Sequence, residues 1–559
     1  MNTQIMAPQL SEVGEAPFQE TCKAGYSFYP VWLVSEKDVQ GEPSQDSAPQ
    51  LWVGDVAEGQ VRKIERLMSE GKYTEALTLG LKVRGDRASL VEPGNDDSRL
   101  TCAEFDLHYA RAFVYIGDAK RGILRDEGIL ADWEAGQNPE DIAQQGDPHS
   151  MEGSRRNYVL GRAHNDLGYA YFVEQGRCAL APQELESALP YFRASGLWEE
   201  YANTCNNIGR VYTQLYQRGL AEEWADKALE LRLKWSDEYR VALSLRLQSS
   251  ICSTFDPSER AYHLAMQSFD ICERQGKKRG IGLACITVGS ACRQMGNLAG
   301  IYSYTKRVKC LEEAADYLGR AVTIFMDSVE EPVRLIEAYY ELGCVYRDQA
   351  KLARDEDANP ALAVSFTDRA VELLRITADL TRDSHPLWYV DACLALVETA
   401  LQAGQFRDAH EWLERAYEAI PPVYVLQAGE GLAEIPIAER IEGFWYRLGK
   451  IELLCGHLTC DRSLNSHPGP LSRGVLIQAV AHYALAMHYF RHYSKETPDL
   501  ISSGHSIYSR LQHAQTEDIH YMREQALPSF IHDNGLDAPE LDLALDCALM
   551  IGQDQVAAA

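Results

Sequence analysis

The chain has 559 residues, of which 46% are hydrophobic and 24% are charged, so it is long enough for several domains or one extended array with a buried core. Its 54 basic and 82 acidic side chains give a formal net charge of −28, which disfavours nucleic acid and anionic membrane surfaces as partners. The 14 cysteines contain no Cys-x-x-Cys pair, which disfavours a zinc scaffold, and we interpret them as free thiols in a reducing compartment.

The first 55 residues show neither a helical nor a strand period, and we interpret 1–55 as an irregular N-terminal arm. The start, MNTQIMAPQLSEVGEAPFQE, has no basic segment and no apolar run, so it does not predict a secretory signal. No stretch approaches the roughly 18 apolar residues that a membrane helix requires. We therefore expect a cytoplasmic protein without a membrane partner.

Residues 56–500 repeat a pair of helical segments. In the first segment a glycine is followed three residues later by an aromatic residue, as in Gly168 and Tyr171. Seven residues are about two helical turns, so residues with that spacing share one face, where small side chains let two helices approach closely. One helix pair cannot bury its apolar stripe alone, so the pairs must stack. The second segment carries two alanines seven residues apart, at Ala221 and Ala228, Ala314 and Ala321, Ala363 and Ala370, Ala409 and Ala416, and Ala479 and Ala486.

This pattern resembles the tetratricopeptide repeat family over roughly residues 57–490. The segment MSEGKYTEAL matches the family at Gly71, Tyr73 and Ala76. The resemblance implies an all-α fold, an α-solenoid in which about eight or nine helix pairs form a right-handed superhelix with a concave binding face. The best single copy, LVETALQAGQFRDAHEWLERAYEAIP, matches the family at Gly404, Phe406, Ala409, Leu413, Ala416 and Pro421.

The repeats are longer than the 34 residues of the family. The repeat glycines at 168, 209, 289, 343 and 449 are separated by 41, 80, 54 and 106 residues. We expect loops at 134–154 and 457–474, and such long repeats resemble those of kinesin light chains and of the sensor arrays in signal-transduction ATPases. Residues 501–559 predict a helix at about 504–526, a turn at Asp-Asn-Gly and a short amphipathic helix, which we expect to cap the array. The predicted insertions are 122–156, 297–311, 350–360 and 457–476.

The resemblance also places a peptide-binding groove on the first helices of two repeats. Asparagine amides both donate and accept hydrogen bonds, so they can pair with the backbone of an extended peptide, as they do in kinesin light chains and bacterial peptide-sensing repeats. The alternative is a solvated polar face whose asparagines cap their own helix. The predicted groove residues are Arg162, Asn165, Tyr169, Asn203, Asn206, Asn207, Arg210 and Gln214.

A second candidate is a basic patch, because eight basic residues and no acidic residue lie between Arg274 and Cys310. Such a patch could bind an acidic partner segment or a phosphate. The alternative is that it neutralises acidic stretches of the same chain, such as 92–97 and 355–360. Apart from Arg274 itself, the predicted patch consists of the other seven, Lys277, Lys278, Arg279, Arg293, Lys306, Arg307 and Lys309.

His488 and His492 are four residues apart and share a helix face, which is the spacing of a metal pair, but the spacing supplies no further ligand. We find no phosphate-binding loop, dinucleotide-binding fingerprint, nucleophile elbow or His-Glu-x-x-His motif. We therefore expect no catalytic residue, metal or cofactor, and predict a scaffold that captures a protein or peptide. One alternative is a regulatory sensor subunit that binds a protein trigger and controls a separate effector. Another is a metal-dependent enzyme that uses the helix containing His482 and His492.

Overall fold

The computed structural model shows an α-helical array. It describes residues 63–545, so the predicted N-terminal arm at 1–55 lies outside the described residues. Within the described ranges, no helix is long and apolar enough to cross a membrane. The eleven cysteines described there are free thiols, as predicted. The description has gaps at 65, 69–70, 86–95, 135–136, 146, 149, 176–178, 236–237, 299, 358, 427–434, 436–440, 442, 467–468, 495–496, 537, 540 and 542–543.

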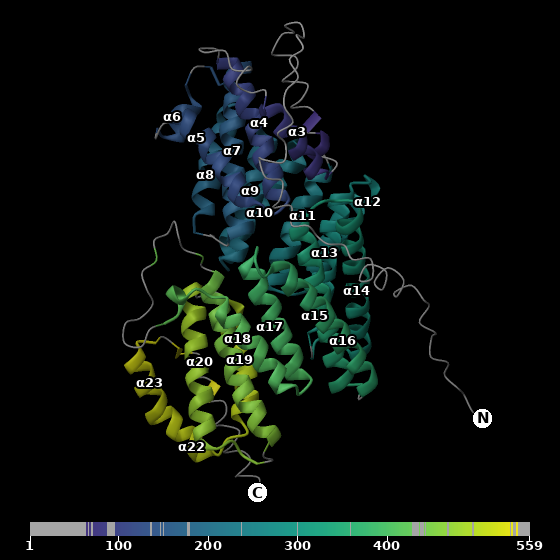
Figure 1. Cartoon of the computed structure of the whole chain (residues 1–559). Helices are drawn as coiled ribbons and strands as arrows, with labels where there is room; N and C mark the ends of the chain where they lie inside the picture. The colour runs from purple at the N-terminus through teal and green to yellow at the C-terminus, as the bar shows by residue number, and fades with distance from the viewer. Residues whose placement is uncertain are drawn as a thin grey trace, which may run out of the picture. The chain divides into compact units, whose positions relative to one another are not determined.

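Most of the helices follow one another along the chain with short connections, whereas α18 and α19 are separated by a longer segment (Figure 1). A 3-10 turn, η3, covers Pro422–Tyr424, and a π-helical turn, η5, covers Met522–Ala526. The α-helices are α3 (Tyr73–Gly85), α4 (Asp96–Tyr115), α5 (Ala119–Glu134), α6 (Pro139–Ala143), α7 (Met151–Gln175), α8 (Ala181–Ala194), α9 (Trp198–Gln214), α10 (Arg218–Trp235), α11 (Glu238–Phe255), α12 (Glu259–Arg274), α13 (Lys278–Gly296), α14 (Tyr304–Asp327), α15 (Pro332–Asp355), α16 (Pro360–Thr381), α17 (Pro386–Gln402), α18 (Phe406–Glu418), α19 (Gly443–Ser466), α20 (Arg473–Tyr493), α21 (Pro498–Leu511), α22 (Thr516–Tyr521) and α23 (Leu527–Asn534).

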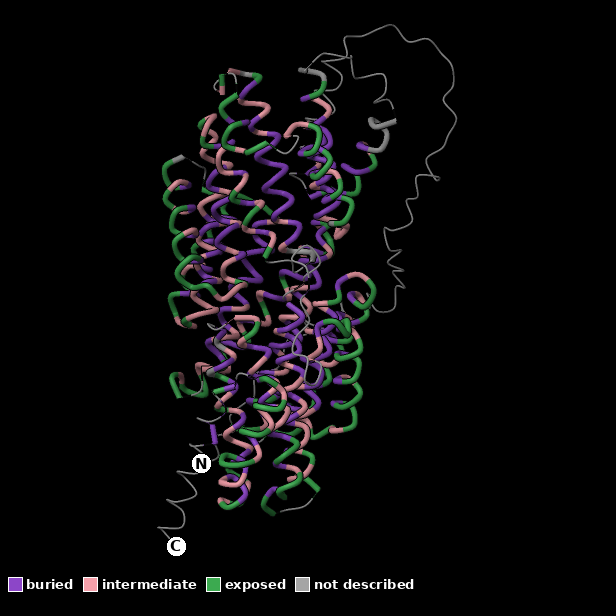
Figure 2. Tube along the Cα trace, turned by 90° about the vertical axis from the view of Figure 1, so that its left-hand side faces the viewer, coloured by how far each residue is buried: buried purple, intermediate pink, exposed green. Residues whose placement is uncertain are grey.

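Consecutive helices pack as antiparallel pairs, and each pair packs on the next. The pairs include α7 with α8, α9 with α10, α11 with α12, α13 with α14, α15 with α16, α17 with α18 and α19 with α20. Along most helices buried and exposed residues alternate, because one side faces neighbouring helices and the other faces solvent (Figure 2). This arrangement is an all-α solenoid, which confirms the predicted fold class.

Small residues bring the two helices of a pair together, as the repeat pattern predicts. A side chain at Gly168 on α7 would place its Cβ 2.7 Å from Leu185 Cγ on α8, which is too close for any real contact. Ser249 takes the corresponding place on α11, where its hydroxyl donates to the Ala261 carbonyl at 2.7 Å. This serine explains why no repeat glycine stands between 209 and 289. All ten alanines of the predicted pairs are buried, at Ala221, Ala228, Ala314, Ala321, Ala363, Ala370, Ala409, Ala416, Ala479 and Ala486.

The extra length of the repeats lies mostly in the helices themselves. α14 and α15 each have 24 residues, which extends them into the predicted insertions at 297–311 and 350–360. The prediction of a loop at 457–474 is wrong for the first half of that segment, since α19 continues to Ser466. The helix continues because its apolar face does: Cys460 is fully buried, and His457 Nδ1 lies 3.0 Å from the hydroxyl of Tyr483. Within the loop expected at 134–154, Asn138 caps the short helix α6.

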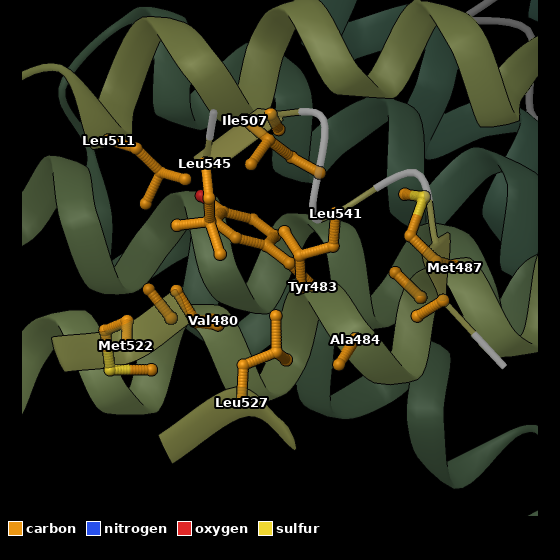
Figure 3. Packing of buried hydrophobic residues seen from close by; sticks show 14 of the residues in the cluster. Val480, Tyr483, Ala484, Met487, Ile507, Leu511, Met522, Leu527, Leu541 and Leu545 are labelled. Atoms are coloured by element: carbon orange, nitrogen blue, oxygen red, sulfur yellow. The ribbon is translucent and has the colours of Figure 1, made fainter. Parts of the chain in front are cut away.

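The C-terminal helices share one apolar core with α20. Val480, Tyr483 and Met487 of α20 meet residues of α21 and of the segment after α23, including Leu541 and Leu545 (Figure 3). The helix expected at about 504–526 is interrupted, because α21 ends at Leu511 and α22 begins at Thr516. α23 ends at Asn534, and Gly535 of the predicted Asp-Asn-Gly turn caps it with a φ of 62°, a conformation that favours glycine.

Contacts between helices distant in sequence bring the array back on itself. The Tyr73 hydroxyl of α3 donates to Glu331 Oε1 at 2.9 Å, directly before α15. Arg334 Nη2 of α15 donates to the Tyr169 hydroxyl of α7 at 3.0 Å. The first helices of the pairs α7–α8 through α15–α16 therefore surround a pocket. These contacts join α3 and α7 to the beginning of α15 across the concave face that we expected.

Candidate functional site

The enclosed space is a polar pocket with a volume of about 80 Å³. Its walls come from α4, α7, α9, α11, α13 and α15, and α10 contributes one residue. Seven arginines line it, which is an unusual concentration in a chain of net charge −28. The lining residues are Arg111, Val114, Tyr115, Arg162, Asn165, Asp166, Tyr169, Asn203, Asn206, Asn207, Arg210, Arg232, Leu243, Arg246, Arg279, Leu283 and Arg334.

Seven of the eight predicted groove residues line this one pocket, and their role in binding stays a prediction. The exception is Gln214, which ends α9 outside the pocket, where its carbonyl accepts a hydrogen bond from the Tyr493 hydroxyl at 2.7 Å. The sequence did not identify Arg246, although a signal exists. Arg246 stands three residues before Ser249, as Asn165 stands three residues before Gly168. Because serine replaces the repeat glycine, the register of α11 could not be recognised.

Two of the pocket arginines share carboxylates on α7 and α9. Arg111 Nε lies 3.0 Å from Asp166 Oδ2, and Arg162 Nη2 lies 3.0 Å from Asp166 Oδ1. Arg162 Nη1 also lies 2.7 Å from Glu200 Oε2. These ion pairs are largely buried, so each arginine has a partner that offsets part of the cost of removing its charge from water.

Two further arginines are paired at the beginning of α15. Arg279 of α13 forms an ion pair with Glu331. Arg334 Nη1 lies 2.6 Å from Glu337 Oε2, while Arg334 Nη2 contacts Tyr169. Burial alone would raise the pKa of Glu337, but the guanidinium of Arg334 outweighs it and lowers that pKa. This cluster holds α15 against α7 and α13.

The remaining three arginines have no carboxylate partner in the described part of the chain. Arg232 is 1% exposed, and its guanidinium donates only to neutral oxygens, among them Ser244 Oγ at 3.0 Å and Asn206 Oδ1 at 3.3 Å. Burial lowers its pKa to about 10. Burial and the charges of Arg210 and other arginines lower the pKa of Arg246 to about 9. The Nε atoms of Arg232 and Arg246 are buried without a hydrogen-bond partner.

The positive charges of the pocket affect the pKa of the Tyr169 phenol. Burial by itself raises the pKa of a tyrosine, but the guanidinium groups of Arg334, Arg210 and Arg279 outweigh burial and lower the pKa of Tyr169 to about 8. The guanidinium carbon of Arg210 lies 5.5 Å from the centre of the Tyr169 ring. A group that is easier to deprotonate at this position shows that the pocket stabilises negative charge.

Some of the amide groups of the pocket asparagines already form hydrogen bonds with other residues of the pocket. Asn165 Oδ1 accepts from Asn207 Nδ2 at 2.9 Å and from Thr204 Oγ1 at 3.2 Å. The Oδ1 atoms of Asn203 and Asn206 accept from Arg232. No hydrogen bond within the described ranges uses the Nδ2 atoms of Asn203 and Asn206 or the Oδ1 of Asn207. One acceptor and two amide donors therefore remain for a ligand.

The predicted basic patch is dispersed rather than continuous. Arg279 lies in the pocket, and Arg293 pairs with Glu341 at 3.1 Å. Arg307 pairs with Glu356, which belongs to the acidic stretch 355–360. Arg307 therefore neutralises an acidic stretch of the same chain, which was the alternative to partner binding. Binding of an acidic partner or a phosphate at the exposed members of the patch remains a prediction. The others are Lys306, which pairs with Glu259, and the exposed Lys277, Lys278 and Lys309.

The helix that carries the predicted histidine pair contributes to one group of metal-type ligands. His482 Nδ1 lies 2.6 Å from Glu452 Oε2, and Cys455 completes a group whose ligand atoms lie within 4.8 Å of one another. His492 instead packs edge-on against Trp445 at 4.3 Å between ring centres. Burial and Glu452 raise the pKa of the Cys455 thiol, so that without a bound cation this thiol is neutral.

No model of a known protein family matches the chain, and no curated protein sequence matches it. Among solved structures, a Rap protein complexed with competence and sporulation factor is 14% identical, with a TM-score of 0.47 over 80% of this chain and 99% of that one. The apo form of RapI is 14% identical, with a TM-score of 0.40 over 79% and 99%. Aspartyl phosphate phosphatase F from Bacillus subtilis is 12% identical, with a TM-score of 0.30 over 70% and 100%. All three scores are below 0.5, so the fold rests on the helix pairing of the chain itself.

Proposed function

We propose that this chain is a protein- or peptide-binding repeat array that captures a partner segment at the arginine- and asparagine-lined pocket. The observation that carries the proposal is the set of free amide groups on α9. Asn203 and Asn206 offer Nδ2 donors and Asn207 offers an Oδ1 acceptor in the pocket lining, and these match the carbonyl and N–H groups of a peptide backbone. The resemblance of α9 to the asparagine-bearing helices of kinesin light chains and bacterial peptide-sensing repeats supports the same function.

The size of the pocket limits how a partner can bind. Its volume of about 80 Å³ exceeds the roughly 10–15 Å³ that one water molecule needs but is well below the roughly 300 Å³ of a typical small-molecule site. One side chain or one chain end therefore fits, whereas an extended peptide does not. In our proposal a single anchoring group enters the pocket, and the rest of the partner segment lies across α9 and its neighbours.

A pool of random synthetic heptapeptides tests this function directly. The protein is incubated with the pool, separated from unbound peptide by gel filtration, and the retained peptides are identified by mass spectrometry. N203A/N207A should retain fewer peptides, because it removes one free donor and the free acceptor. N465A provides the matched control, since Asn465 is exposed on α19 far from the pocket. Equal retention by the wild-type protein, N203A/N207A and an unrelated helical protein would refute capture at this site.

The contacts that close the array favour a regulatory sensor as the second candidate. Arg334 holds α15 to Tyr169 of α7, directly at the pocket wall. A ligand that competes for either residue would separate the two helices, and in a stacked array such a change can pass to neighbouring repeats. Hydrogen exchange at 330–336 should then rise when a retained peptide is added. Unchanged exchange at those amides would leave a passive scaffold as the function.

A further inference from the structure

The pocket carries more positive charge than its own residues neutralise. Seven guanidinium groups line it, and four carboxylates pair with them, which leaves an excess of three positive charges among the residues that the structure describes. A buried charge without a partner is costly, so proteins usually pair it or let it contact a ligand. The four paired carboxylates are Asp166, Glu200, Glu331 and Glu337.

The three unpaired arginines are neighbours in the array, since Arg210 is on α9, Arg232 on α10 and Arg246 on α11. Arg232 lies deepest and is fixed by neutral oxygens of Asn206 and Ser244. Arg210 and Arg246 are partly exposed at the pocket, and neither forms an ion pair in the described ranges. The carboxylate of Glu337 acts on both of them, but it already pairs with Arg334. The buried Nε donors of Arg232 and Arg246 still lack an acceptor.

Neutral polar groups would satisfy these donors but would leave the charges uncompensated. A carboxylate supplies both the acceptors and the charge, and its two oxygens match the planar fork of a guanidinium. It also fits a pocket that admits one side chain or one chain end.

We propose that the pocket binds a carboxylate of the partner segment, either an aspartate or glutamate side chain or a free C-terminus, between Arg210 and Arg246. This inference rests on the proposed peptide-binding function and specifies its ligand.

Four pools of otherwise random heptapeptides test the inference with the same gel-filtration assay. Three pools have blocked termini and carry glutamate, glutamine or lysine at the central position, and the fourth carries glutamine with a free C-terminal carboxylate. We expect the wild-type protein to retain the glutamate pool, the free-acid pool or both about tenfold more than the blocked glutamine pool, as for a charge-assisted hydrogen bond. Enrichment of the glutamate pool alone identifies a side-chain carboxylate, and enrichment of the free-acid pool alone identifies a C-terminus.

R210Q/R246Q should abolish this preference, whereas K277Q/K309Q should keep it. Both double variants remove two positive charges, but Lys277 and Lys309 are exposed and do not line the pocket. The melting temperature separates binding from folding: removal of two uncompensated arginines should leave it unchanged or raise it. A preference that survives in R210Q/R246Q would overturn the inference.

The outcomes also separate this inference from the proposed function. Equal retention of all four pools by the wild-type protein would preserve peptide capture and overturn the carboxylate site. If no pool is retained, acetate and phosphate are titrated while the melting temperature is followed. A rise for the wild-type protein that is absent in R210Q/R246Q would support a small-anion site and overturn peptide capture. No rise would overturn both.

Discussion

His164 on α7 predicts a specific dependence of stability on pH. Its Nδ1 lies 2.8 Å from Glu184 Oε2 and its Nε2 lies 2.8 Å from Glu134 Oε1, so both nitrogens can donate only if the ring is protonated. Burial by itself lowers the pKa of this imidazole, but the hydrogen bonds and charges of the two glutamates outweigh burial and raise the pKa to about 9. Tyr191 also donates to Glu134, which fixes the carboxylate beside the ring.

A pKa that rises from 6.5 in the unfolded chain to about 9 in the folded one corresponds to about 3 kcal/mol of stability. Because the folded value is the higher one, this contribution is complete below pH 6.5 and is lost as the pH rises through 9. H164Q keeps one donor but no charge, so it should be less stable than the wild-type protein by about 3 kcal/mol near pH 6. The difference should shrink steadily towards pH 9.5.

Urea unfolding followed by circular dichroism at several pH values between 6 and 10 measures this difference. Because the repeats of an array need not unfold together, hydrogen exchange of the α7 amides provides a local measurement of the same quantity. H410Q is the control, since His410 is exposed on α18 and its replacement should change stability by under about 0.5 kcal/mol at every pH. A wild-type advantage over H164Q that stays constant from pH 6 to 9.5 would show that the imidazole is not held in its charged form.

Further predictions concern packing and the pocket. G289A should destabilise the array by about 1–2 kcal/mol in urea unfolding, because its Cβ would lie 2.5 Å from Leu318 Cγ, whereas G319A, with no atom within 4 Å, should stabilise it by about 0.5–1 kcal/mol. If G289A and G319A changed the free energy of unfolding in the same direction, the packing argument would be contradicted. Spectrophotometric titration should find one tyrosine that ionises near pH 8 and that is missing in Y169F. D126N should raise the free energy of unfolding by more than about 1 kcal/mol at pH 7, and the gain should grow with pH, because burial and nearby carboxylates raise the pKa of Asp126 and both of its oxygens lack partners. A constant gain would argue against a raised pKa.

The sequence contained enough information for the fold because the helix contacts depend on residue size at fixed spacing. Alanines seven residues apart and Gly168 against Leu185 are local patterns, and the structure buries them as the pattern predicts. The end of α19 was missed because the Gly- and Pro-containing segment after it concealed two further turns of helix, whose buried face includes Cys460.

The pocket could be predicted only in part, for a physical reason. The residues on α7 and α9 were found because they share the register of the repeat. Arg232 projects from a second helix, and Arg334 reaches Tyr169 across 165 positions in the sequence. Such contacts depend on the angle through which the solenoid turns at each repeat. Small tilts between many helices add up to this angle, so no motif within a single repeat predicts it.

The closure at Glu331 also constrains how this array can change in length. An open solenoid tolerates duplication or loss of a repeat, because each repeat touches only its neighbours. Here Tyr73 from the beginning of the array and Arg279 from its middle meet on the same carboxylate. Insertion of one more helix pair between them would carry the carboxylate away from the tyrosine, so the number of repeats in this part of the molecule is fixed by its geometry.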